Sequence, residues 1–153
     1  MAAEYLANAV QSVSLNNPVI FTASIPCRKG YVYHEDETGI FVLRGIVNNP
    51  CEGYAQYKVT FNGNITIPAG GTVGPVAVAI KISGEERPTS RAIYTPAAVG
   101  EANYGNVTST AIVKVPKGCC FSMSIDAVPA STTGTPAPVI NVQNANLVVE
   151  RIA

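Results

Sequence analysis

The C-terminal stretch, residues 141–153, predicts a β-strand with apolar side chains on both of its faces. Successive side chains of a strand point to opposite faces, so Leu147 and Val149 share one face. Val148 and Ile152 share the other. A strand that is apolar on both faces needs cover on both. One cover is the core of the same chain, and the other is either a second layer or a neighbouring subunit.

Composition indicates a single all-β domain. The chain has 153 residues, enough for one sizeable core, and frequent Val, Ile, Thr, Gly and Pro favour strands joined by turns. Ten Lys and Arg balance ten Asp and Glu, and no basic run occurs. Because phosphate binding needs clustered positive charge, nucleic acid is not an expected partner.

The sequence shows neither a membrane span nor a secretory signal. No apolar run approaches the roughly 20 residues that cross a bilayer. The first residues lack the basic and apolar regions of a signal peptide. We therefore expect a protein that is made and assembled in the cytoplasm, or one that leaves by another route.

Residues 1–16 carry an ambiguous pattern and are interpreted as an N-terminal arm ahead of a domain at 17–153. Leu6, Val10 and Val13 have the 4–3 spacing of a short helix, whereas residues 11–15 alternate like a strand. Two interpretations remain open. The arm is frayed or lies on a neighbour, or these three residues anchor the domain to a larger assembly.

Alternating apolar and polar side chains predict about eight to ten strands across the domain. The clearest alternation runs from Tyr57 to Ile67, and Gly63 within it is a candidate bulge. The pattern from residue 119 to residue 127 predicts a strand with Cys119 in the core. Four residues of that strand are expected to face outward: Cys120, Ser122, Ser124 and Asp126.

The four cysteines are Cys27, Cys51, Cys119 and Cys120. A bond between the two neighbours would be strained, because adjacent strand residues face opposite ways. Without a secretory signal, we expect free thiols that pack as small apolar groups. The alternative is cross-linking between subunits.

The order of five segments resembles the strands of a known family. Residues 17–22, 38–43 and 57–61 are similar to its early strands, 78–84 to its middle hairpin and 145–152 to its closing strand. The family is the C1q/TNF-like jelly-roll superfamily, and the likeness extends to small Firmicutes and prophage-encoded proteins and to spore-surface domains. The resemblance covers roughly residues 17–153. Ala55 stands where the family usually has Gly, and no collagen-like stem precedes residue 17.

This resemblance implies a fold and an assembly. The fold is an all-β, two-sheet antiparallel jelly-roll sandwich. The assembly is a homotrimer whose closing strand faces the threefold axis, which would cover Val148 and Ile152. Tyr57 and Phe61 fit the same interface, because aromatic residues are common there.

The sequence predicts no catalytic residue, cofactor or metal ion. His34 is the single histidine and lies beside Glu35, Asp36 and Glu37. Four consecutive residues cannot all converge on one ion, so we expect a solvated hairpin tip. Asn64 and Asn106 begin glycosylation triplets, which arise by chance in chains rich in Asn and Thr.

We therefore expect a non-enzymatic structural protein, namely a trimeric decoration or head-fibre protein on a phage virion. Its arm would dock on the capsid, and it would be made in the host cytoplasm. One alternative is a subunit of a bacterial surface or spore appendage or coat. Another is a glycan-binding adhesion module, with sugars stacked on Tyr31, Tyr33, Tyr94 and Tyr104.

Overall fold

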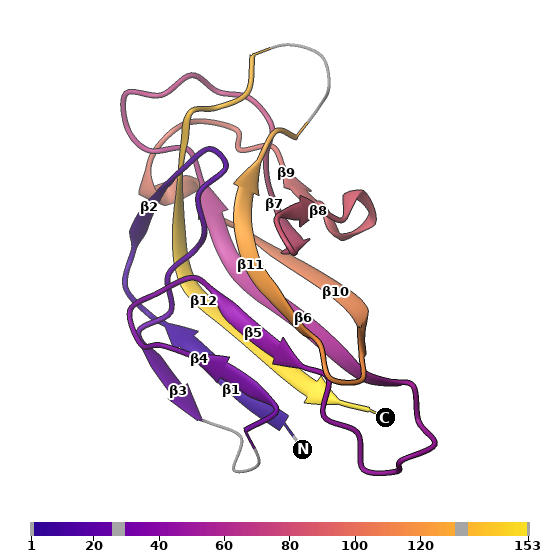
Figure 1. The fold of residues 1–153 in the computed structure, drawn as a ribbon. Coiled ribbons are helices and arrows are strands. Elements are labelled where there is room, and N and C mark those ends of the chain that lie inside the picture. The colour runs from indigo at the N-terminus through magenta and orange to yellow at the C-terminus, as the bar shows by residue number, and fades with distance from the viewer. Residues whose placement is uncertain (1, 26–29, 131–134, 153) are drawn as a thin grey trace.

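The computed structural model describes residues 2–25, 30–130 and 135–152, which form two antiparallel six-stranded sheets packed as a sandwich (Figure 1). Sheet A has the order β10-β6-β12-β1-β3, with β2 also paired to β12. Sheet B has the order β4-β5-β11-β7-β8, with β9 also paired to β7. This architecture confirms the predicted two-sheet jelly-roll sandwich. No helix in the described ranges is long and apolar enough to cross a membrane.

The strands of sheet A are β1 (Ala2–Ala7), β2 (Gln11–Ser14), β3 (Ala23–Ile25), β6 (Tyr54–Thr66), β10 (Gly105–Pro116) and β12 (Val139–Arg151). Those of sheet B are β4 (Val32–His34), β5 (Phe41–Arg44), β7 (Val76–Ile82), β8 (Glu85–Glu86), β9 (Ala92–Tyr94) and β11 (Cys120–Val128). Two short 3-10 helices, Pro88–Ser90 and Glu101–Asn103, lie in the connections on either side of β9.

The core lies between the two sheets and follows from the alternation along each strand. In β6 every second residue is buried, which places the side chains of Tyr57, Val59 and Phe61 inside. Leu147 and Val149 of β12 are also fully buried, as predicted for one face of the closing strand. The facing residues of sheet B include Phe41, Leu43, Ile80, Met123 and Ile125.

A β-bulge in β12 changes which residues face the core. Before the irregularity the even-numbered residues, such as Val142, face the core. After it the odd-numbered residues, such as Leu147, face the core. Asn144 lies in the bulge with a φ of +54°. Gly63 of β6 lies opposite, since Gln143 pairs with Asn64 and Asn146 pairs with Asn62. The predicted irregularity at Gly63 therefore exists, but the extra residue is on the partner strand.

Residues 1–16 are not an arm, which corrects the sequence-based interpretation. Strand β1 lies inside sheet A, paired with β12 from Ala2 to Ala7 and with β3 on its other side. Ala3, Tyr5 and Ala7 are buried, and β2 also pairs with β12. Alanine is weakly apolar and favours helices, so its alternation gave little strand signal. The sandwich therefore begins at β1.

The predicted orientation of the β11 segment is partly wrong. Cys119 is exposed, because the strand begins one residue later and Cys119 belongs to the preceding turn. Ser124 and Asp126 were expected to face solvent but are buried. The Asp126 carboxylate lies 3.2 Å from the Lys81 ammonium and accepts a hydrogen bond from the Ser124 hydroxyl at 2.6 Å. This pair allows a charged side chain to lie within the covered part of sheet B.

Candidate interaction surfaces

The side of sheet A that faces away from the core is a broad polar surface, here called the sheet A outer face. Pairing registers align Glu4, Val148, Thr60 and Thr110 in one row across β1, β12, β6 and β10. The outward residues of these strands include Glu4, Leu6, Gln56, Lys58, Thr60, Asn62, Asn64, Asn106, Thr108, Thr110, Ile112, Lys114, Asn146, Val148 and Glu150.

Side-chain hydrogen bonds fix this face. The Asn106 amide donates to the side-chain oxygens of Asn62 at 2.8 Å and Asn64 at 3.1 Å. The Asn146 amide donates to the Glu4 carboxylate at 3.0 Å. These groups are short and bonded to one another, so a second protein surface can approach without first ordering long side chains.

Only two of the four predicted interface residues lie on this face. Val148 is half-buried beside Thr60, and Ile152 is 43% exposed just beyond the end of β12. Tyr57 and Phe61 have 0% exposure inside one chain. A side chain without exposed surface adds no area for a second copy to bury. Tyr57 and Phe61 therefore belong to the core, which corrects their assignment to the oligomer interface.

The three predicted anchor residues do not share a surface. Leu6 lies on the sheet A outer face, Val10 is exposed in the connection between β1 and β2, and Val13 is buried. Val10 contributes to a shallow depression of about 160 Å³, to which Ile20 also contributes. The helical spacing that joined these three residues is therefore not realised.

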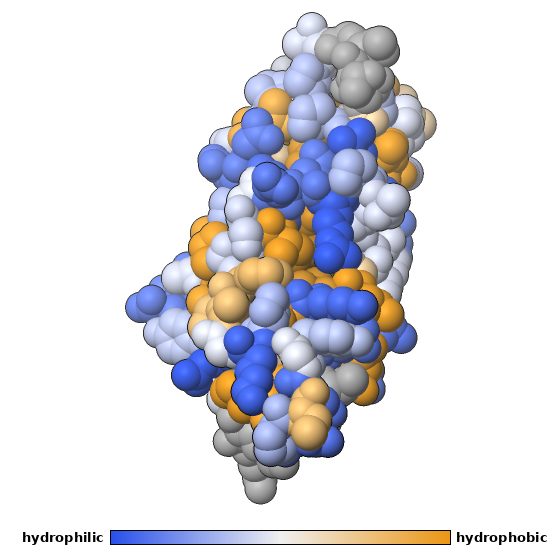
Figure 2. Space-filling model, turned by 45° about the vertical axis from the view of Figure 1, so that its right-hand side comes forward, coloured by the Kyte–Doolittle hydropathy of each residue, from blue (hydrophilic) through white to orange (hydrophobic). Residues whose placement is uncertain are grey.

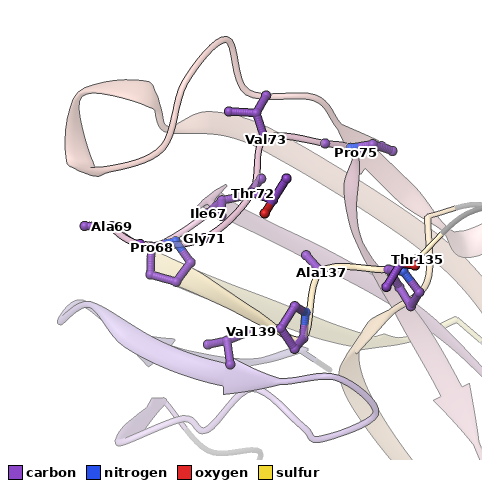
Figure 3. A pocket seen from close by; sticks show the side chains of 14 residues that line it. Ile67, Pro68, Ala69, Gly71, Thr72, Val73, Pro75, Thr135, Ala137 and Val139 are labelled. Atoms are coloured by element: carbon purple, nitrogen blue, oxygen red, sulfur yellow. The ribbon is translucent and has the colours of Figure 1, made fainter.

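A larger hollow, here called the distal cavity, lies at the end of the sandwich where β6 ends and β12 begins (Figure 3). Its volume is about 530 Å³, and its walls are the segments 67–75 and 135–139. The lining is made of small aliphatic groups, prolines and glycines, with hydroxyls from Thr72 and Thr135. None of the described residues that line it has a charged or aromatic side chain. Sequence patterns do not predict this cavity, because its two loops lie far apart along the chain.

Glu35, Asp36 and Glu37 are exposed at a turn, as expected for a solvated hairpin tip, whereas His34 belongs to an aromatic cluster. Its ring stacks on Phe41 with centroids 4.3 Å apart and meets the edge of Tyr5 at 5.0 Å. Its Nε2 lies 2.9 Å from the Thr38 carbonyl. In the described part of the chain, no three His, Cys, Asp or Glu residues are placed to hold a metal ion. The imidazole therefore has a packing role between the two sheets.

Comparisons with known proteins identify the fold. No family model matches the chain. No curated protein matches it by sequence. Solved structures match over nearly its whole length. The globular domain of zebrafish complement 1qA protein matches with a TM-score of 0.61 at 15% identity, covering 99% of this chain and 97% of that one. The chain has the C1q/TNF-like jelly-roll fold.

Two further structures agree with this assignment. Eiger TNF from S. frugiperda matches with a TM-score of 0.60 at 11% identity, covering 100% of this chain and 92% of that one. Murine APRIL at pH 5.0 matches with a TM-score of 0.54 at 11% identity, covering 99% and 98%. The C1q/TNF-like fold thus includes β1 and β2, which the sequence resemblance left outside the domain.

The four tyrosines that could stack on sugars differ in how much of their side chains is exposed in the C1q/TNF-like fold. Tyr33 is 60% exposed, whereas Tyr31 is buried and lies under the guanidinium of Arg151. Tyr94 and Tyr104 are half-buried, and the Tyr94 hydroxyl donates to the Asn103 carbonyl. None of the four lines the distal cavity. The four rings therefore do not form one stacking platform.

Proposed function

We propose that this protein is a non-enzymatic structural subunit that forms a homotrimer through the sheet A outer face and decorates a phage virion. The observation that carries the proposal is that face itself. It spans four paired strands, several of its Asn and Thr side chains are already bonded to one another, and Val148 lies half-buried within it. The C1q/TNF-like fold supports the same assembly.

A closed threefold ring needs two different surfaces on each copy. In this proposal the second surface is the edge where β10 of sheet A contacts β9 of sheet B and the 3-10 helix Pro88–Ser90. There Ile93 is 53% exposed. Ile112, at the margin that this edge shares with the sheet A outer face, is 49% exposed, and the Arg87 guanidinium donates to its carbonyl at 2.7 Å. Figure 2 shows hydrophobic surface through the middle of this side of the molecule, between hydrophilic regions. Packing this edge on the outer face of the next copy would bury both isoleucines.

The two ends of the sandwich have different roles in this proposal. Ala2 pairs with Glu150, so β1 begins at the end where β12 finishes (Figure 1). That end would attach to the particle, in place of the arm expected from the sequence. The loops around the distal cavity would point away from it. The sandwich itself supplies the spacing between particle and loops.

Sedimentation analysis under reducing conditions tests the trimer. A mass of three times the 16.0 kDa chain supports it, and a single-chain mass at micromolar concentration contradicts it. Mass spectrometry of purified virions tests the location separately. The chain should be present in intact particles, and its absence from them would remove the virion part of the proposal.

The distal cavity favours a second candidate function, which is binding of a small neutral ligand. Its volume of about 530 Å³ is within the roughly 300–1,000 Å³ typical of such sites. The apolar lining with two threonine hydroxyls fits a neutral, partly apolar group better than a sugar that stacks on aromatic rings. A glycan array and a screen of neutral apolar compounds would separate these two ligand classes.

A further inference from the structure

Among the residues that the structure describes, three cysteines are free and exposed: Cys51, Cys119 and Cys120. Free cysteine is among the most buried residue types, because its thiol behaves as a small apolar group. Three exposed thiols in one small domain are therefore unusual. The expectation that they pack as small apolar groups is wrong for these three, and Cys27 lies outside the described residues.

The three thiols lie at one end of the sandwich. Cys51 belongs to the loop that precedes β6, and Cys119 to the turn that follows β10. Backbone hydrogen bonds join loop and turn: Gly45 N–H donates to the Cys119 carbonyl at 2.8 Å, and Gly118 N–H donates to the Gly45 carbonyl at 3.0 Å. A third bond runs from Lys117 N–H to the Gly53 carbonyl at 3.0 Å. We call this region, which includes Cys120, the thiol end.

The thiol end coincides with the end proposed to attach to the particle. Pro116 pairs with Tyr54 at the start of β6, and Ile152 N–H donates to the Gln56 carbonyl nearby. The loop and turn therefore lie beside the last residues of β12, as Figure 1 also shows. The distal cavity is at the opposite end of the same strands.

The thiols do not compete with the sheet A outer face for space. Cys120 is the first residue of β11 and pairs with Arg44 of β5, so it lies in sheet B. Inward positions of β11 include Met123 and Ile125, which places Cys120 on the opposite, outer side of that sheet. Cys119 precedes it in the turn, and a bond between these neighbours would be strained. The thiols therefore stay accessible when the sheet A outer face is covered.

We propose that the thiol end is a covalent coupling site for a second copy of this chain. Each copy supplies the same exposed thiols, so one patch is sufficient for both sides of the contact. Acids and bases balance in the chain, so copies approach without strong net repulsion. Because a chain with more than one usable thiol can bond to two neighbours, the product is a series of linked copies. This inference is independent of the proposed trimer.

The coupling is a thiol–disulfide exchange with a small-molecule disulfide as oxidant. A cysteine thiolate attacks one sulfur of the small disulfide, forms a mixed disulfide and releases one small thiol. A thiolate of the second copy then attacks the cysteine sulfur of that mixed disulfide and releases the other small thiol. Overall, two cysteine thiols are oxidised to one disulfide, and the small disulfide is reduced to two thiols.

The test uses the reduced full chain, treated with oxidised glutathione and separated on a denaturing gel without reductant. We expect dimers and larger multiples that return to a single band with dithiothreitol. The variant C51S/C119S/C120S should stay at the single-chain position, whereas Cys27→Ser should give the same ladder as the natural chain. Near-ultraviolet circular dichroism of the triple variant should match that of the natural chain, because serine there replaces exposed thiols.

Three results would overturn the proposal. One is a ladder that persists in the triple variant or disappears in Cys27→Ser. Another is a single-chain product that has lost two hydrogens, which would be an internal bridge. The third is glutathione adducts without any linked chains. The gel detects covalent links alone, and sedimentation under reducing conditions detects the trimer alone, so the two proposals can fail separately.

Discussion

The Tyr57 hydroxyl donates a hydrogen bond to the backbone carbonyl of Arg44 at 2.5 Å and lies 3.2 Å from the carbonyl of Tyr31. Tyr57 belongs to sheet A, whereas Arg44 ends β5 and Tyr31 precedes β4, both strands of sheet B. This side chain therefore joins the two layers across the core. Its role is internal to one chain.

Tyr57→Phe should lower the free energy of unfolding by about 1–2 kcal/mol, because a buried carbonyl loses its donor while the ring packing remains. Urea unfolding under reducing conditions measures the loss. Sedimentation of the same variant should match that of the natural chain. Dissociation of the oligomer at unchanged stability would instead return Tyr57 to the interface.

Lys81→Met should destabilise the fold by about 3 kcal/mol, because Asp126 would remain buried without its cation. Lys114→Met is the matched control. Lys114 is exposed, and its ammonium lies 4.7 Å from the centre of the Tyr54 ring, so its loss should cost at most about 1 kcal/mol. Equal unfolding midpoints in urea for both variants would show that Asp126 does not depend on Lys81.

Gly45→Ala should separate the loop 45–53 from the turn after β10. A Cβ atom at this position would lie 1.9 Å from the Pro116 carbonyl oxygen, so the backbone must move. Overpacking of this kind costs about 1–3 kcal/mol. Gly53→Ala is the control, since its Cβ would have no atom within 4 Å. Thermal melts should show a lower midpoint for the first variant only, and equal midpoints would contradict the contact.

Deletion of residues 1–7 should abolish cooperative folding rather than release an anchor. The deletion removes β1 from between β12 and β3, and with it the buried Tyr5 ring that packs on Phe41, so this part of the core becomes exposed. Far-ultraviolet circular dichroism and limited proteolysis would detect the loss. Val10→Ser, at an exposed position in the same part of the chain, should leave both unchanged. A truncated chain that still melts cooperatively would show that β1 is dispensable.

The fold was largely predictable from strands with strong alternation. Residues 57–67 gave the inward face of β6, and Leu147 with Val149 gave that of β12. Failures occurred where the pattern was weak or interrupted. The small side chains of Ala3 and Ala7 hid β1, and the turn before β11 reversed the expected environment of Cys119.

The candidate surfaces were less predictable, because they depend on residues that are distant in sequence. The alternation along residues 141–153 alone predicts that Val148 faces away from Leu147 and Val149. The pairing of β12 with β1 and β6 places Val148 between Glu4 and Thr60, so the sheet A outer face is less apolar than expected. Aromatic enrichment at interfaces pointed to Tyr57 and Phe61, but the parity of β6 places both in the core. The shared location of Cys51 and Cys119 required the contact between loop and turn.

The most direct test of the central claim compares Val148→Asp with Val42→Asp by sedimentation under reducing conditions. Both valines are half-buried on outward sides of their sheets, Val148 in sheet A and Val42 in sheet B. A carboxylate buried at the subunit contact would be unpaired, so Val148→Asp should fall from three times 16.0 kDa to the single-chain mass and stay folded. Val42→Asp should keep the trimer mass. A trimer that persists in Val148→Asp would contradict assembly through the sheet A outer face.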